Sequence, residues 1–134
     1  SENTEYKYIY ETFQNIALAY TDIKFKLIKN SKVILELQPV SKLNERILQL
    51  NSNINNDMLV EINYEDNLHK VTGYITKPGV FISVIPKQFL FLNGRFIRNS
   101  MLLKAIKEGY ATAMMGKDNP SYFINLQIPS DGLV

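Results

Sequence analysis

The stretch from Gln88 to Ile128 most constrains the fold, because it reads as strand, turn, helix and strand in direct succession. It opens with the apolar run QFLFLN and closes with SYFINLQI. Between these runs, apolar and small residues recur at helical spacing from Leu102 to Ala113, and Asn99 or Ser100 is a candidate cap. Two strands joined by a crossover helix lie parallel in one sheet. We therefore expect a terminal βαβ unit.

Two patterns at the start of the chain predict a helix and a hairpin. Apolar residues fall at helical spacing from Glu5 to Tyr20, with Thr4 as the expected N-cap. Residues 23–38 then alternate between apolar and polar, with a break at Asn30 and Ser31. This alternation indicates two antiparallel strands with one solvated face.

The middle of the chain predicts a short helix, a polar loop and a second hairpin. Ser41 is the expected cap of the short helix, and the following NSNINND is too polar to pack, so we expect a mobile loop. The next strands run over Leu59–Tyr64 and Leu68–Thr76, and Lys77–Gly79 forms a turn. The run VFISVI and the run QFLFLN lack alternation, as in strands that are covered on both faces or as in a poorly paired connector and a central strand. The whole order predicts an α+β domain with helices covering a mixed sheet.

Composition limits the classes of protein to which the chain can belong. Its 134 residues suit one domain, and its 46% hydrophobic and 21% charged residues are typical of globular proteins. The sequence has no cysteine and one histidine, His69, which argues against disulfides and zinc sites. The start SENTEY lacks a signal pattern and no segment is apolar enough for a membrane span, so we expect a cytoplasmic protein.

The arginines are the most informative polar residues. The net charge of +2 permits nucleic-acid binding without indicating it, yet two of only three arginines, Arg95 and Arg98, lie close together. A guanidinium can grip a phosphate through two hydrogen bonds, and a helix N-terminus also attracts anions. Residues 93–100 are therefore a candidate phosphate-facing corner. A solvated turn explains the same residues more simply, and the residues alone leave both interpretations open.

Other polar clusters do not indicate a reaction centre. The sequence lacks the glycine motifs that hold nucleotides and the motifs that present a nucleophile. Turn polarity accounts for Glu61, Glu65 and Asp66, and a solvated hairpin face accounts for the lysines between Lys24 and Lys32. We expect neither catalytic residues nor a metal site.

Several segments together resemble the transducer domain of the MutL family of DNA mismatch repair proteins. The segment FLNGRFIRNSMLLKAIKEGY is similar to the family's "FVNGR" phrase and the helix that follows it. Four other segments resemble, in order, the family's opening helix and hairpin, its short helix, its next hairpin and the stretch before "DVNVHPxK": QNIALAYTDIKFKLIKNSKVILEL, KLNERILQL, HKVTGYITKP and SYFINLQIPSDGLV.

The resemblance implies a ribosomal protein S5 domain 2-like fold with a left-handed βαβ crossover. It implies that residues 1–134 are a single transducer domain that does not hydrolyse ATP, with an ATPase domain before it and a His-Pro-x-Lys segment after it. The parent protein would bind ATP and Mg²⁺, dimerise through its N-terminal region, contact DNA phosphates and couple to a MutS-like partner. It would be associated with the nucleoid when bound to DNA.

The resemblance also selects candidate DNA-binding residues. Ser100 occupies a position at which some relatives carry a basic residue, which places that contact in doubt. Two other functions stay open: the second domain of a type II topoisomerase ATPase subunit, whose usual "QTK" loop is missing here, and a protein-interaction module that does not bind DNA. The candidates are Asn93, Gly94, Arg95, Arg98, Ser100, Lys104 and Lys107.

Overall fold

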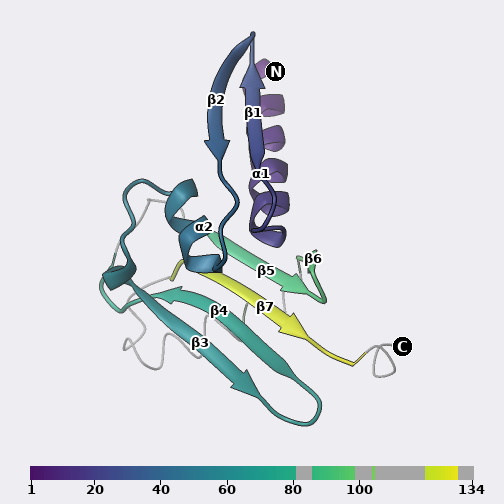
Figure 1. Cartoon of the computed structure of the whole chain (residues 1–134), viewed down its shortest axis with the longest axis vertical. Helices are drawn as coiled ribbons and strands as arrows, with labels where there is room; N and C mark the ends of the chain where they lie inside the picture. The colour runs from purple at the N-terminus through teal and green to yellow at the C-terminus, as the bar shows by residue number, and fades with distance from the viewer. Residues whose placement is uncertain (81–85, 99–103, 105–119, 130–134) are drawn as a thin grey trace. The chain divides into compact units, whose positions relative to one another are not determined.

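The computed structural model describes residues 1–80, 86–98, 104 and 120–129. The chain divides into two compact units, unit 1 (Ser1–Ile54) and unit 2 (Asn55–Val134), and the expectation of a single domain stays a prediction. Unit 1 contains α1 (Glu2–Ala19), β1 (Phe25–Lys29), β2 (Lys32–Leu37) and α2 (Leu43–Leu50). Unit 2 contains the 3₁₀ helix η1 (Asn56–Met58), β3 (Leu59–Glu65), β4 (Lys70–Thr76), β5 (Gln88–Leu92), β6 (Arg95–Phe96) and β7 (Tyr122–Gln127) (Figure 1).

The first helix is confirmed but begins earlier than predicted, and it buries Gln14, Ala17 and Leu18, whereas Ile9, Ile16 and Tyr20 of the predicted stripe are exposed. Ser1 is its N-cap, because the Ser1 hydroxyl accepts a hydrogen bond of 3.3 Å from the Thr4 backbone N–H. The prediction that Thr4 is the cap was therefore wrong. The apolar stripe could not locate this end, because the first turn of α1 consists of polar residues that a cap alone organises.

The predicted hairpin of unit 1 is confirmed. Strands β1 and β2 pair antiparallel from Phe25 opposite Leu37 to Lys29 opposite Lys32. Asn30 and Ser31 connect them with φ values of 51° and 62°, and two positive φ values in succession are those of a type I′ hairpin turn.

The short helix α2 forms where expected, but Ser41 is not its cap. The N-cap is Lys42, whose side chain makes no capping hydrogen bond. The Ser41 hydroxyl instead donates to the Glu45 carboxylate at 3.2 Å. The helix is held in place by Arg46, Ile47 and Leu50, the side chains that it buries.

The polar segment after α2 packs, contrary to the prediction of a mobile loop. Asn51 and Ile54 are both 7% exposed, and the Asn51 side-chain amide donates to the Ile47 carbonyl at 2.9 Å. In unit 2, the Asn55 side chain accepts from the Asp57 N–H at 3.0 Å and caps η1. Asparagine side chains therefore satisfy backbone groups here, so the polar composition does not prevent order.

Unit 2 is built on a five-stranded mixed sheet in the order β3-β4-β7-β5-β6. Figure 1 shows β7 between β4 and β5. Strands β5 and β7 are parallel and the other neighbours are antiparallel, which confirms the predicted parallel pair. Apart from Lys104, the helix expected between β5 and β7 lies outside the described residues, and so does the handedness of its crossover. Most of the run VFISVI also lies outside them.

The two faces of this sheet are packed with different side chains. One face carries the cluster of Leu90, Tyr122 and Ile124, against which Ile62, Val71, Ile75 and Ile97 pack. The other face carries four phenylalanines, with the rings of Phe89 and Phe123 stacked at 5.5 Å. The successive residues Phe89, Leu90 and Phe91 are all buried. This burial confirms that β5 is covered on both faces.

Gly73 allows β4 to lie close against β7. Its φ is 142°, and a Cβ added at this position would overlap the carbonyl oxygen of Phe123. A residue with a side chain would therefore have to separate the two strands or bend β4.

Candidate nucleic-acid interface

The candidate interface is a two-residue hairpin turn between β5 and β6. Leu92 lies opposite Arg95, and Phe91 lies opposite Phe96. Asn93 and Gly94 form the turn with φ values of 48° and 84°, which suit the Asn-Gly pair of a type I′ turn. The sequence analysis placed these residues at a direct passage from strand to helix. It missed β6, because a two-residue strand has no detectable alternation.

The turn is tied to the end of β7 through Asn93. The Asn93 backbone N–H donates to the Leu126 carbonyl at 2.9 Å, and its side-chain oxygen accepts from the Ile128 N–H at 3.0 Å. These two hydrogen bonds hold both the backbone and the side chain of Asn93 in place. The position of Gly94 and Arg95 is consequently linked to the chain that leaves β7.

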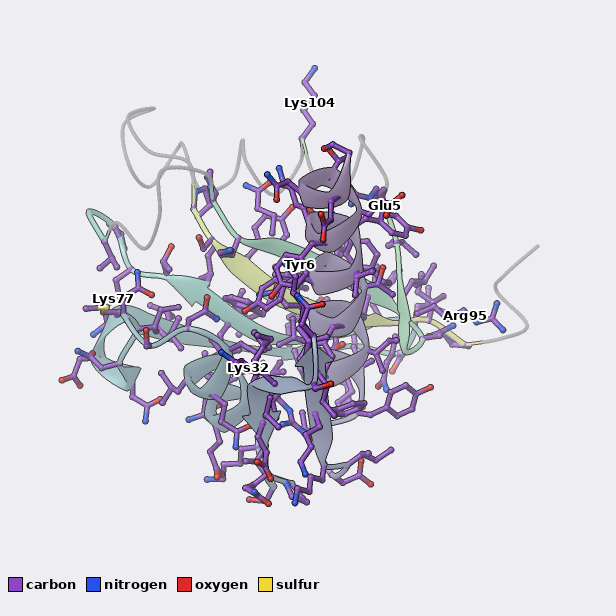
Figure 2. All side chains as sticks on the ribbon, turned by 90° about the horizontal axis from the view of Figure 1, so that it is seen from above. Glu5, Tyr6, Lys32, Lys77, Arg95 and Lys104 are labelled. Carbon is purple, nitrogen blue, oxygen red and sulfur yellow. The ribbon has the colours of Figure 1, made fainter. Side chains whose placement is uncertain are left out.

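The two candidate arginines are both exposed, but the hairpin sends them to opposite faces. Arg95 lies opposite Leu92 and therefore shares the face of Leu90, because side chains alternate along a strand. The Arg98 guanidinium lies 5.5 Å from the centre of the Phe96 ring, which belongs to the phenylalanine face. The two side chains therefore leave the hairpin in different directions. Figure 2 shows Arg95 extending outward from the body of unit 2.

The remaining candidates are placed only in part. Lys104 is helical and exposed (Figure 2), whereas Ser100 and Lys107 lie outside the described residues. Apart from Gly94 and its two chain neighbours, no described atom lies within 4 Å of a Cβ built on Gly94, so this part of the described structure leaves the backbone open to a ligand. The assignment of this residue set to DNA binding stays a prediction.

The acidic cluster of the second hairpin organises a turn. The Asp66 carboxylate accepts hydrogen bonds from the N–H groups of Leu68 and His69 and from the Tyr64 hydroxyl. These hydrogen bonds, the one from Leu68 foremost, lower the pKa of Asp66 to about 2. These contacts confirm turn polarity for Asp66, whereas Glu61 lies on β3 and its carboxylate accepts from the Tyr74 hydroxyl at 3.0 Å.

A shallow cavity of about 490 Å³ joins this acidic turn to the candidate interface. Residues 65–70, Asn93 and residues 127–129 line it. Glu65 and Asp66 supply negative charge there, and Lys70 supplies positive charge. This mixed charge does not favour a phosphate inside the cavity, so the exposed arginines are the better anion contacts.

Sequence reasoning missed the role of the third arginine, Arg46 of unit 1. Its side chain is 0% exposed, and burial lowers the pKa of its guanidinium. Its Nη2 donates to the carbonyls of Tyr20, Thr21 and Ile23, and its Nη1 donates to the carbonyl of Gln38 and the side chain of Gln49, at distances from 2.6 to 3.3 Å. The spacing gave a usable signal, because Arg46 falls between Leu43 and Leu50 on the apolar stripe of α2.

The described part of the chain contains neither a candidate metal cluster nor a candidate membrane span. Within it, no group of three or more histidine, aspartate or glutamate side chains is arranged to hold a metal ion. None of the helices described there has the length and apolar character that crossing a membrane requires.

Comparisons with known proteins agree with one another. The profile of the family described as "DNA mismatch repair protein, C-terminal domain" matches residues 47–133. The DNA mismatch repair protein MutL of Christiangramia forsetii is 30% identical over 128 residues, which cover 96% of this chain and 21% of that protein. MutL of Flavobacterium psychrophilum is 33% identical over 129 residues, with 96% and 21% covered.

Solved structures show the same fold. The Aquifex aeolicus MutL ATPase domain complexed with ADP superposes with a TM-score of 0.69 at 20% identity, covering 96% of this chain and 45% of that one. A second structure of the Aquifex aeolicus MutL ATPase domain gives a TM-score of 0.71 at 16% identity, covering 96% and 44%. These matches and the mixed sheet confirm the predicted α+β, ribosomal protein S5 domain 2-like fold.

The matches cover different shares of this chain and of its relatives. The chain spans about a fifth of the length of the curated relatives. The family profile covers more than half of the chain, including nearly all of unit 2. The chain therefore belongs to the MutL family of DNA mismatch repair proteins.

Proposed function

We propose that this chain contacts the DNA backbone through the Asn93–Gly94 turn and relays the nucleotide state of a MutL-type parent protein. The observation that carries this proposal is the exposure of Arg95 and Arg98 on a turn that is hydrogen-bonded to the end of β7. The reported matches are to MutL proteins, so the topoisomerase alternative is set aside.

The positions of the arginines define the kind of DNA contact. Side chains on opposite faces of the hairpin would reach different phosphates, each as a separate charge-assisted contact. Phosphate contacts carry no base sequence, and their strength falls steeply as salt is added. The proposed binding is therefore independent of sequence and sensitive to salt.

The relay is supported by the hydrogen bond between Asn93 and Ile128. A shift of the chain beyond β7 would change this hydrogen bond, and the turn that carries Arg95 would respond. Such a relay requires a second state with different contacts. The described residues contain no glycine-rich phosphate loop and no acidic cluster for Mg²⁺, so in this proposal other parts of the parent hold ATP and Mg²⁺. Dimerisation and contact with a MutS-like protein likewise belong to the parent.

The test is a salt titration of the affinity of the 134-residue chain for duplex DNA, followed by fluorescence anisotropy. Arg95→Gln and Arg98→Gln should each lower the slope of log affinity against log salt by about 0.9, because each removes one phosphate contact. Arg95→Glu combined with Arg98→Glu should weaken binding further through repulsion. Changing the sequence of the duplex should leave the affinities unchanged.

The control is Lys77→Gln, since Figure 2 shows Lys77 and Arg95 at opposite sides of the view. This variant should keep the slope of the unmodified chain. Equal affinities of the unmodified chain and the double glutamate variant would overturn the proposal. That result would favour the protein-interaction module instead.

A further inference from the structure

Strand β3 forms an open edge of the sheet in unit 2. Among the described residues it pairs only with β4, in continuous register from Leu59 opposite Thr76 to Glu65 opposite Lys70. The register contains no bulge, so the edge is straight enough to receive another strand. Figure 1 shows β3 along one side of the sheet.

The hydrogen bonds at the two ends of this pair show which backbone groups point outward. Lys77 N–H donates to the Met58 carbonyl and Asp66 N–H donates to the His69 carbonyl, both at 2.9 Å. Bonded pairs alternate with non-bonded pairs in an antiparallel ladder, so the even-numbered residues of β3 bond to β4 and the odd-numbered residues face outward. The Leu59 N–H is taken by the Asn56 carbonyl. The outward N–H and C=O groups are therefore those of Glu61, Asn63 and Glu65.

Among the described residues, this edge has no lysine, proline or bulge, and its charge is only negative. Open edges are commonly blocked by lysine, proline or a bulge, and the sequence of β3, LVEINYE, contains none of these. Its charged residues are Glu61 and Glu65, and the Glu61 carboxylate is held by the Tyr74 hydroxyl at 3.0 Å. An antiparallel second copy centred on Asn63 would place Glu61 opposite Glu65. Like charges repel there, which argues against self-pairing.

The side chains of β3 indicate what the added strand should look like. Val60 and Tyr64 lie on one face and are 41% and 55% exposed, whereas Glu61 and Glu65 lie on the other. A strand that alternates apolar and basic residues would pack on Val60 and Tyr64 and pair with both carboxylates. We propose that the β3 edge binds an extended segment of a partner protein, with alternating basic and apolar residues, by strand addition.

The binding test uses the whole 134-residue chain and an end-blocked peptide that alternates lysine and valine over the length of β3. Fluorescence anisotropy should detect binding, and hydrogen exchange should show new protection of the Glu61, Asn63 and Glu65 amides. A peptide with glutamate in place of lysine should bind at least roughly tenfold more weakly, since each lost opposite-charge pair becomes a repulsive one. N-methylation of alternate peptide nitrogens should abolish binding, because it removes the ladder donors.

Two substitutions of Asn63 separate the contribution of its backbone N–H from that of its side chain. Asn63→Pro deletes an outward N–H that makes no bond to β4 and should weaken binding by roughly tenfold, whereas Asn63→Ala should keep it. If Asn63→Pro disturbs the β3–β4 ladder, the N-methylated peptide decides the question on the unmodified chain. The proposal is overturned if the lysine–valine peptide does not bind, if the glutamate peptide binds equally well, or if protection appears elsewhere.

Discussion

Unit 1 and unit 2 hold their interiors together by different means. The most buried large side chain of unit 1 is Arg46, which connects α2 to the chain around Tyr20 and to Gln38 through hydrogen bonds. In unit 2 the corresponding side chains are Tyr122 and Phe123, in the middle of the sheet. Order in unit 1 thus draws on one buried polar side chain together with a few buried apolar ones such as Leu37 and Ile47, whereas order in unit 2 is spread over a strand ladder and many apolar contacts.

The exposed apolar side chains show the same contrast. Among the described residues of unit 2 the large ones are Val60, Tyr64 and Leu68. Unit 1 exposes a longer series on α1 and its hairpin, namely Tyr8, Ile9, Ile16, Tyr20, Ile23, Ile28, Val33 and Ile34. Less of its apolar surface contributes to stability, so the loss of Arg46 should matter more. A single residue can therefore be decisive for stability where the core is small.

The substitution with the largest expected effect on this difference between the units is Arg46→Met. The substitution leaves the carbonyls of Tyr20, Thr21, Ile23 and Gln38 without their donor, and we expect a loss of about 3–5 kcal/mol in the free energy of unfolding. Urea unfolding of the whole chain measures this loss. Hydrogen exchange should accelerate in unit 1 and stay unchanged at the β4–β7 pairing of unit 2.

Two control variants accompany Arg46→Met. Arg46→Lys keeps the charge but loses the planar fork, so it should fall between the unmodified chain and Arg46→Met. Lys24→Met breaks the exposed ion pair with Glu36, whose atoms are 3.0 Å apart, and should leave stability unchanged within error. Full stability in Arg46→Met would remove the basis of the comparison.

Gly73→Ala should produce the next largest effect, and in unit 2 only. The added methyl group would overlap the Phe123 carbonyl and force β4 from β7, which we expect to cost about 2–3 kcal/mol in the free energy of unfolding. Gly79→Ala is the matched control, because its φ is also positive, 82°, but no atom lies near the new Cβ. It should cost about 1 kcal/mol. Equal thermal shifts in the two variants would contradict the proposed close approach of the strands.

The smallest expected effect is acid sensitivity at Asp66. Because its folded pKa of about 2 lies below its unfolded value, its stabilising contribution is complete above that unfolded value and is lost as pH falls through about 2. Melting temperatures measured across this acid range should fall less steeply for Asp66→Asn than for the unmodified chain. The effect should persist in high salt, since the main partners of Asp66 are neutral donors. The lowered pKa of Glu36 in unit 1 depends on Lys24 and should be sensitive to salt.

The features predicted correctly from the sequence are those that repeat along the chain. The helical spacing in α1, the alternation of the hairpins and the uninterrupted apolar run of β5 each involve many residues, so no single contact decides them. The parallel pairing of β5 and β7 followed from their connection.

The features that were missed depend on single contacts that leave no repeating pattern in the sequence. Hydrogen bonds from the Asn51 amide and to the Ser1 hydroxyl determined the order after α2 and the start of α1. At the candidate interface, the pattern identified the Asn-Gly turn but not β6, so it could not show that Arg95 and Arg98 face apart. The burial of Arg46 was not predicted, although its helical spacing on α2 favours burial.

The open edge at β3 also limits how many partners one chain can bind through the sheet of unit 2. A strand added to β3 would complete that side of unit 2, while the opposite side ends in the two-residue β6, which is too short to template a full-length neighbour. Within the sheet of unit 2, growth by repeated strand addition therefore has no second full-length attachment point among the described strands. Any assembly formed through β3 should stop at one partner per chain instead of extending into fibres.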